Sequence, residues 1–122
     1  MKIGLMSDSH DAVHLVEKAV KVFLHFECQY LFHAGDFVSP FAFQKMECFP
    51  GPVYSVFGNN EGEKPIIRQI ASNFPEWVLE DEILETKIGT CRIAMKHRDK
   101  GVRSLAHSGD FDYVFYGHTH RV

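Results

Sequence analysis

The sequence predicts an α/β domain built on a mostly parallel sheet with one antiparallel hairpin. Residues 2–7 form a short apolar run typical of a buried strand, residues 12–26 repeat apolar side chains at helical spacing, and residues 29–35 form a second apolar run. A strand, a helix and a strand within about thirty residues are the signature of a parallel βαβ unit. The 122 residues and the hydrophobic content of 45% suit a domain with a substantial core.

The remaining elements are assigned from local signals along the chain. Pro40 suits the first turn of a helix, and Gly89-Thr90 suits the turn of a hairpin. In chain order we expect a short helix from Pro40 through Glu47, a strand at 52–58, a helix at 64–73, two hairpin strands within 81–97, a short helix at 100–109 and a buried strand at 111–117. No repeat or linker divides the chain, so a single domain over residues 1–122 is expected.

Composition and charge argue against several classes of protein. The net charge of -3 and the isoelectric point near 6.2 disfavour broad binding of nucleic acid or of an anionic membrane surface. The three cysteines have no CxxC spacing, which favours a reducing compartment over a disulfide framework. The sequence contains neither the apolar region of a signal peptide nor the roughly 20 apolar residues of a membrane helix. We therefore expect a cytoplasmic protein.

Side chains that bind metals follow the predicted strands, at the point where each strand ends. In open α/β sheets, ligands bind beyond the carboxyl ends of the strands. Glycine precedes several of these side chains and allows the sharp turn that aims them back across the sheet edge. The residues at these positions are Asp8, His10, Asp36, Asn59, His97, His118 and His120.

The spacing of these side chains favours two metal ions over one. In extended backbone, residues i and i+2 point to the same side about 7 Å apart. The pairs Asp8/His10 and His118/His120 therefore suit two neighbouring ions. Asp36 stands alone after its strand, and its two carboxylate oxygens suit a bridge between the ions. Mixed nitrogen and oxygen ligands without thiolate favour Mn, Fe, Co, Zn or Ni over a structural zinc cage.

Each segment taken alone also has a structural interpretation. Asp8 suits an N-cap or a loop, Asn59 suits a turn, and His97 within Lys-His-Arg-Asp suits a solvated charge cluster. Without a metal site, the structural interpretation would have to be true for all five segments at once. The coincidence that this requires favours the metal site. His33 lies on the strand that precedes Asp36 and is a candidate for orienting that ligand.

Four short motifs together resemble a known family. The stretches SDSH, HAGDF, FGNNEGE and YGHTH occur in the order and with the spacing of the calcineurin-like metallophosphoesterase superfamily. They are most similar to its small archaeal and bacterial phosphodiesterases. The resemblance covers residue 2 to the last residue, and it implies two packed mixed β-sheets flanked by helices, with a metal site at the carboxyl ends of the strands. It also implies that C-terminal strands of the family are missing, so we expect a C-terminally truncated domain.

The resemblance implies a centre of two divalent ions, with Mn as the first expectation and Ni, Fe, Co or Zn as alternatives. The implied activity is hydrolysis of small phosphoesters, chiefly phosphodiesters, by a metal-bound hydroxide that attacks phosphorus in line. The implied catalytic residues are Asp36, Asn59 and His97, and the candidates for binding substrate are Asn60, Arg98 and Arg121. The implied ligands are Asp8, His10 and His120 for one ion, Asn59, His97 and His118 for the other, and Asp36 for both.

Three departures from the family pattern bear on activity. Asn60 stands where many members have a histidine that acts as general acid, and an amide is a poor proton donor, which favours esters with good leaving groups. Arg98 stands where members usually have glycine, and its cation would either bind substrate phosphate or repel the second ion. Relatives also continue beyond the position where this chain stops.

Arg98 and the expected truncation leave a second function open, namely a catalytically weak or inactive binding or scaffold module with the same fold. Metal content measured together with turnover would discriminate between the two functions. A missing strand would expose a sheet edge, so we also expect copies of the chain to associate. A third alternative, a nuclease, would require a basic groove that the net charge of -3 does not promise.

Overall fold

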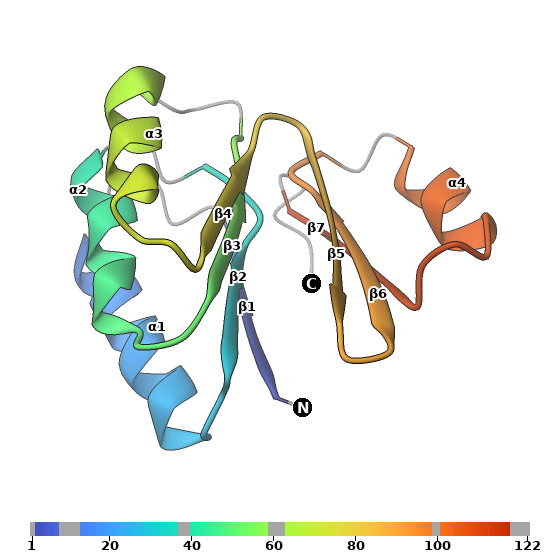
Figure 1. The fold of residues 1–122 in the computed structure, drawn as a ribbon. Helices are drawn as coiled ribbons and strands as arrows, with labels where there is room; N and C mark the ends of the chain where they lie inside the picture. The colour runs from blue at the N-terminus through green and yellow to red at the C-terminus, as the bar shows by residue number, and fades with distance from the viewer. Residues whose placement is uncertain (1, 8–12, 37–39, 59–62, 99–100, 118–122) are drawn as a thin grey trace.

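Two β-sheets pack against each other at the centre of the molecule, and helices cover the outer face of one of them (Figure 1). The structure, a computed structural model, describes residues 2–7, 13–36, 40–58, 63–98 and 101–117. The expectation of an α/β fold with two packed sheets flanked by helices is confirmed.

The first sheet contains four parallel strands in the order β1–β2–β3–β4. Their bounds are Ile3–Met6 for β1, Tyr30–His33 for β2, Val53–Val56 for β3 and Trp77–Glu80 for β4. The sequence analysis assigns no strand to β4, because its four residues are too few to establish an alternating pattern. β4 forms because it pairs along its whole length with β3, with Trp77 opposite Val53 and Glu80 opposite Val56.

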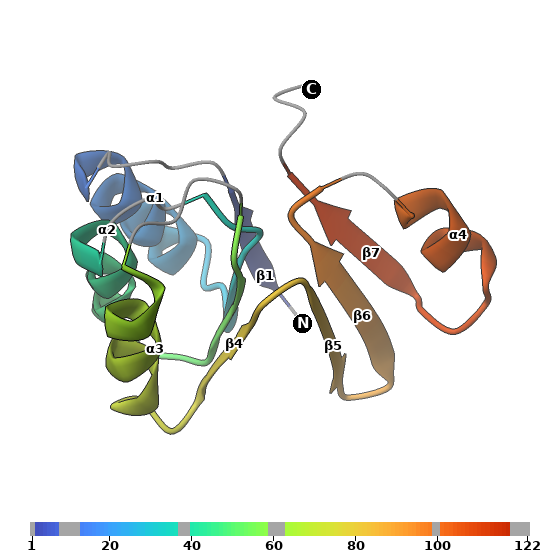
Figure 2. The ribbon, with the colours of Figure 1, turned by 90° about the horizontal axis from the view of Figure 1, so that it is seen from above.

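The helices that precede β4 in the chain lie on one face of this sheet (Figure 2). The apolar side chains that predict the first helix, Val16 and Val20 among them, are fully buried there. No helix within the described residues is long and apolar enough to cross a membrane. The helical elements are α1 (Val13–His25), α2 (Pro40–Gln44), the short 3-10 helix η1 (Lys45–Cys48) and α3 (Lys64–Ser72).

The second sheet contains the predicted hairpin and the last predicted strand, in the order β5–β6–β7. Its elements are β5 (Ile83–Ile88), β6 (Cys91–Lys96) and β7 (Tyr113–Tyr116), with the short helix α4 (Val102–His107) between β6 and β7. β5 and β6 are antiparallel around Gly89, whose φ of 60° is a conformation that glycine adopts readily. β7 runs parallel to β6, so this sheet is mixed whereas the first is parallel throughout its described strands.

Two clusters of buried apolar residues hold these layers together. One lies between the helices and the first sheet and includes Val20, Leu31 and Phe43. The other lies between the two sheets and includes Phe32, Val56, Leu84, Ile93 and Met95. Neighbouring residues such as Leu31 and Phe32 serve different clusters because successive side chains of a strand point to opposite faces.

The expectation that the first and last strands are buried is wrong. Leu5 of β1 is 44% exposed, and Tyr113 and Tyr116 of β7 are 52% and 47% exposed. β1 and β7 stand at the ends of the strand orders in the described part of the two sheets, so each has a described neighbour on one side. An apolar run therefore predicts the existence of these strands but not their position at an edge.

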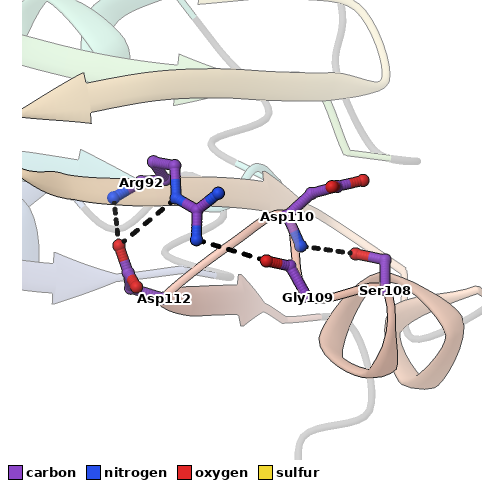
Figure 3. A network of polar contacts seen from close by, with 5 residues as sticks. All are labelled: Arg92, Ser108, Gly109, Asp110 and Asp112. Atoms are coloured by element: carbon purple, nitrogen blue, oxygen red, sulfur yellow. Dashed lines mark hydrogen bonds and ion pairs between the residues drawn. The ribbon is translucent and has the colours of Figure 1, made fainter.

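A polar network joins the start of β7 to β6 (Figure 3). The backbone nitrogen of Arg92 donates to Oδ2 of Asp112 at 2.8 Å, and Nη2 of Arg92 donates to the carbonyl oxygen of Gly109 at 3.2 Å. The backbone nitrogen of Asp112 in turn donates to the carbonyl oxygen of Arg92 at 2.8 Å. The donation from Arg92 and its positive charge hold the pKa of Asp112 below its usual range. The network therefore fixes where β7 begins beside β6.

Candidate metal centre

The carboxyl ends of the four parallel strands lie level at one edge of the first sheet. The register pairs Met6 with His33, His33 with Ser55, and Val56 with Glu80. The segments that follow β1, β2 and β3 therefore leave the sheet from the same edge, which is the usual position of a ligand site in a parallel sheet.

Asp36 lies in a sharp turn after β2 and is packed against the end of β3. Gly35 and Asp36 both have left-handed backbone, with φ of 98° and 68°, and this conformation is uncommon for residues other than glycine. A Cβ atom on Gly35 would lie 2.7 Å from the backbone nitrogen of Gly58, and a Cβ atom on Gly58 would lie 2.6 Å from Oδ1 of Asp36. The close approach of the two turns therefore requires both glycines, and it holds the Asp36 carboxylate against the residue that precedes Asn59 in the chain.

His97 comes from the second sheet, directly after β6, and its ring reaches the first sheet. The side chain is only 3% exposed, which excludes the interpretation of His97 as part of a solvated charge cluster. Its Nδ1 lies 2.7 Å from the carbonyl oxygen of Ala34, and because a carbonyl oxygen can only accept, Nδ1 carries the proton. The carbonyl oxygen of His97 accepts a hydrogen bond of 2.9 Å from the backbone nitrogen of Gly117. This hydrogen bond joins the end of β7 to the residue that directly follows β6.

The side chains of Asp36 and His97 face each other in the interior, with Oδ2 and Nε2 3.7 Å apart. With the proton on Nδ1, a neutral His97 ring presents a lone pair at Nε2 toward the carboxylate, so the two facing atoms are both electron-pair donors. Two ligands at about 2.0–2.2 Å from one ion can be up to roughly 4 Å apart, so this spacing suits a shared cation. The buried pair of residues therefore fits the ligand chemistry of a metal ion.

His33 supports the turn that carries Asp36. The ring is fully buried, and its Nδ1 accepts a hydrogen bond of 3.0 Å from the backbone nitrogen of Gly35. The neighbouring residue on β3, Ser55, is also buried, and its hydroxyl has no hydrogen-bond partner among the described residues. This geometry suits the predicted role of His33 in orienting Asp36, because the ring fixes the backbone between them.

Of the predicted site residues, the structure brings together Asp36 and His97, with His33 adjoining them through Gly35. Within the described ranges, no group of three or more His, Cys, Asp and Glu side chains is close enough to hold a metal ion. The other predicted site residues, which lie outside the described residues, are Asp8, His10, Asn59, Asn60, His118, His120 and Arg121.

A cavity of about 400 Å³ opens beside this pair, and Gly58, His97 and Arg98 contribute to its wall. The exposed Arg98 is thus adjacent to His97 on the cavity side, as a substrate-binding residue would be. The sequence analysis did not single out Lys64 and Lys96, which also line the cavity. The sequence could have identified both lysines by their proximity to predicted ligands. Lys64 follows the FGNNEGE motif, and Lys96 directly precedes His97.

Comparison with known proteins decides the family of the chain. The model of the calcineurin-like phosphoesterase superfamily domain matches residues 1–122. The chain belongs to this superfamily. The resemblance inferred from the four sequence motifs is thereby confirmed.

Several known proteins are similar to most of the chain. The phosphodiesterase MJ0936 of Methanocaldococcus jannaschii is 33% identical over 122 residues, a match that covers 98% of this chain and 74% of the relative. A solved structure described as a novel archaeal phosphodiesterase superimposes with a TM-score of 0.89 at 31% identity, covering 99% of this chain and 74% of that one. The phosphoesterase Yfce from E. coli has a TM-score of 0.62 at 17% identity, covering 82% of this chain and 59% of that one, and it supports the fold alone.

Proposed function

We propose that the chain hydrolyses small phosphodiesters at a centre of two divalent metal ions, with Mn as the preferred metal and Ni, Fe, Co or Zn as alternatives. The observation that carries this proposal is the buried pair of Asp36 and His97, whose donor atoms face each other at 3.7 Å at the carboxyl edge of the sheet. Membership of the superfamily and the similarity to phosphodiesterases support the same chemistry.

Contacts within the protein hold the described residues of the proposed centre in position. The hydrogen bond between His97 and the carbonyl oxygen of Ala34 fixes the ring and directs Nε2 toward Asp36. The contact with Gly58 limits the positions that the Asp36 carboxylate can take. Because both side chains are almost fully buried, water competes weakly with any cation that they hold.

We assign the remaining ligands by the superfamily pattern. Gly58 and Gly117 are adjacent in the chain to Asn59 and His118, and each of these glycines is in contact with a residue of the buried pair. The proposed ligands are Asp8, His10 and His120 for one ion, Asn59, His97 and His118 for the other, and Asp36 as the bridge. Two such ions activate water as a nucleophile at neutral pH and neutralise charge on the phosphoryl oxygens.

The chain's own residues restrict the substrates. Asn60 replaces the general acid of many members and is a poor proton donor, so esters with good leaving groups should react fastest. Arg98 lines the cavity beside His97, which favours its proposed role in binding substrate phosphate over its alternative role of repelling a metal ion. Arg121 is a further candidate for binding the substrate.

The test is hydrolysis of an activated aryl phosphodiester, bis(p-nitrophenyl) phosphate, by the purified chain with Mn²⁺. Asp36→Asn and His118→Ala should each lower kcat/KM by more than roughly 100-fold, because each removes a ligand. His107→Ala on the exposed surface of α4 is the matched control and should retain full activity. A loss of no more than a few fold in the first two variants would overturn the two-metal mechanism.

The scaffold function remains the second candidate, because Arg98 stands where members of the family usually have glycine. Metal content measured by mass spectrometry on the same sample separates the two candidates. Full metal occupancy without turnover of any phosphoester would favour the scaffold. The cytoplasmic location and the association of copies stay predictions, and sedimentation at several protein concentrations checks the second.

A further inference from the structure

A second cavity, of about 460 Å³, opens at the amino edge of the first sheet, where its parallel strands begin. It lies between residues 47–51, which lead into β3, and residues 74–77, which lead from α3 into β4 (Figure 1). The register pairs Val53 with Trp77, so the two segments enter the sheet side by side. This amino-edge cavity is therefore at the opposite end of the strands from the candidate metal centre.

Stacked aromatic rings contribute to one wall of the amino-edge cavity. The rings of Phe74 and Trp77 are stacked, with their centroids 4.2 Å apart. The buried ring of Phe43 contacts Trp77 edge-on, with a centroid distance of 5.4 Å, so the core fixes the position of the indole. Phe74 and Trp77 are nevertheless only partly buried, and part of their ring surface is accessible to a ligand.

The wall on the other side of the cavity is rigid as well. Phe49 lines the cavity and is only 3% exposed, so its ring belongs to the core. A Cβ atom on Gly51 would lie 2.9 Å from this ring and 2.6 Å from the carbonyl oxygen of Gln29, so the backbone of the segment is packed directly against both. The cavity is therefore formed before any ligand arrives, and binding requires little ordering of the protein.

Each of the two segments also contributes one glutamate to the cavity lining, Glu47 on the first and Glu76 on the second. Both residues are exposed, and neither forms an ion pair with another described residue. Lys45, two residues before Glu47, is paired instead with Glu17 of α1, with its Nζ 3.1 Å from Oε1. The described lining contains no Lys, Arg or His, so a positively charged ligand meets two carboxylates there and no lining cation that repels it.

We propose that the amino-edge cavity binds a small organic cation whose ammonium group carries methyl groups. The faces of aromatic rings attract cations, and the indole of Trp does so most strongly. Methyl groups on the ammonium make apolar contacts with the same rings, and the two carboxylates add Coulomb attraction. The volume of about 460 Å³ lies within the range of small-molecule sites. This inference does not depend on the proposed function, because the cavity and the candidate metal centre lie at opposite edges of the sheet.

The test measures binding of choline to the intact chain by the fluorescence of Trp77, the single tryptophan, which lines the cavity. The comparison ligand is 3,3-dimethyl-1-butanol, which has the shape of choline without its charge, and sodium chloride keeps the ionic strength equal. Choline should give a saturable change and bind about tenfold or more tightly than the alcohol, because only choline gains cation–π and carboxylate attraction.

Substitutions in the cavity separate the contributions of charge and ring. Glu47→Gln and Glu76→Gln should each weaken choline binding by about threefold and leave binding of the alcohol unchanged. Phe74→Leu keeps an apolar side chain but removes the ring, so it should weaken choline binding more than binding of the alcohol. Glu85→Gln on β5 is the matched control, since Leu84 beside it is buried between the sheets and Glu85 therefore faces away from the first sheet.

A preference for choline that is lost in the double variant Glu47→Gln/Glu76→Gln and kept in Glu85→Gln would support the inference, whether or not the chain hydrolyses any phosphoester. Urea unfolding of each variant establishes that the loss is not a loss of the fold. Equal affinity for choline and the alcohol, or a preference that the double variant retains, would overturn the inference. The absence of saturable choline binding in both fluorescence and calorimetry would overturn it as well.

Discussion

Gly58 is in such close contact with Asp36 that a methyl group cannot fit between them. A Cβ atom on Gly58 would lie 2.5 Å from the backbone nitrogen of Asp36 and 2.6 Å from its Oδ1. We predict that Gly58→Ala destabilises the fold by about 1–3 kcal/mol and displaces the carboxylate. Urea unfolding followed by the fluorescence of Trp77, the single tryptophan, measures the first effect, and metal content measures the second.

Gly89→Ala is the matched control for this prediction. Gly89 lies in the hairpin turn with φ of 60°, and no atom lies within 4 Å of a Cβ placed there. This variant should lose about 1–2 kcal/mol through backbone strain alone and should keep its metal and activity. Equal metal binding in the two variants would show that the contact between Gly58 and Asp36 does not position the ligand.

His33 provides the second prediction, because its Nδ1 is the described acceptor for the backbone N–H of Gly35. His33→Leu leaves that buried N–H without this acceptor, so the free energy of unfolding should fall by about 1–3 kcal/mol. The turn that carries Asp36 loses its support, and metal affinity should fall by roughly 10–100-fold. The exposed His25→Leu on α1 should change neither quantity, and an unchanged metal affinity in His33→Leu would limit His33 to a structural role.

Ser55 gives a prediction of the opposite sign. Its hydroxyl is buried and has no hydrogen-bond partner among the described residues, so burial of the hydroxyl is a cost without a compensating bond. Ser55→Ala should therefore be neutral or stabilising by up to about 1 kcal/mol in urea unfolding. Ser72→Ala at an exposed site should stay within about 0.5 kcal/mol of the parent. A clear destabilisation by Ser55→Ala would mean that the hydroxyl is hydrogen-bonded in solution.

The network of Arg92 and Asp112 predicts a pH dependence of stability. The pKa of Asp112 is lowered in the folded state, chiefly by the hydrogen bond from the backbone of Arg92. Its contribution to stability is therefore present above the unfolded pKa of about 3.9 and is lost as the pH falls through the lower folded value. Asp112→Asn should be less stable than the parent at neutral pH, and the difference should vanish in acid. Thermal unfolding between pH 2 and pH 7 measures this.

Asp110→Asn is the control for the pH experiment. Its backbone nitrogen donates to Ser108, but its carboxylate makes none of the contacts in the network (Figure 3). The free energy of unfolding of Asp110→Asn should equal that of the parent at every pH. A difference between Asp112→Asn and the parent that persists in acid would contradict the electrostatic origin of the effect.

Local sequence patterns were sufficient to predict most elements of the fold. The apolar runs of β2 and β3 and the helical spacing of Val16 and Val20 are properties of short segments, and each of these elements forms as predicted. β4 was missed because a strand of four residues depends on its pairing with β3. The exposure of Tyr113 and Tyr116 was missed because an apolar run does not reveal whether a strand has a neighbour on each side.

The candidate site likewise has features that the sequence predicts and features that only the tertiary structure decides. The sequence by itself determined that Asp, Asn and His residues, whose side chains can bind metals, follow the strands, because strand ends and glycine turns are local features. Only the tertiary structure decided that the ring of His97 is directed by Ala34, 63 residues away, and that Lys64 and Lys96 line one cavity. The physical reason is that the direction of a lone pair and the set of side chains that line a cavity depend on atoms from distant segments, and no local pattern of residues encodes their distances.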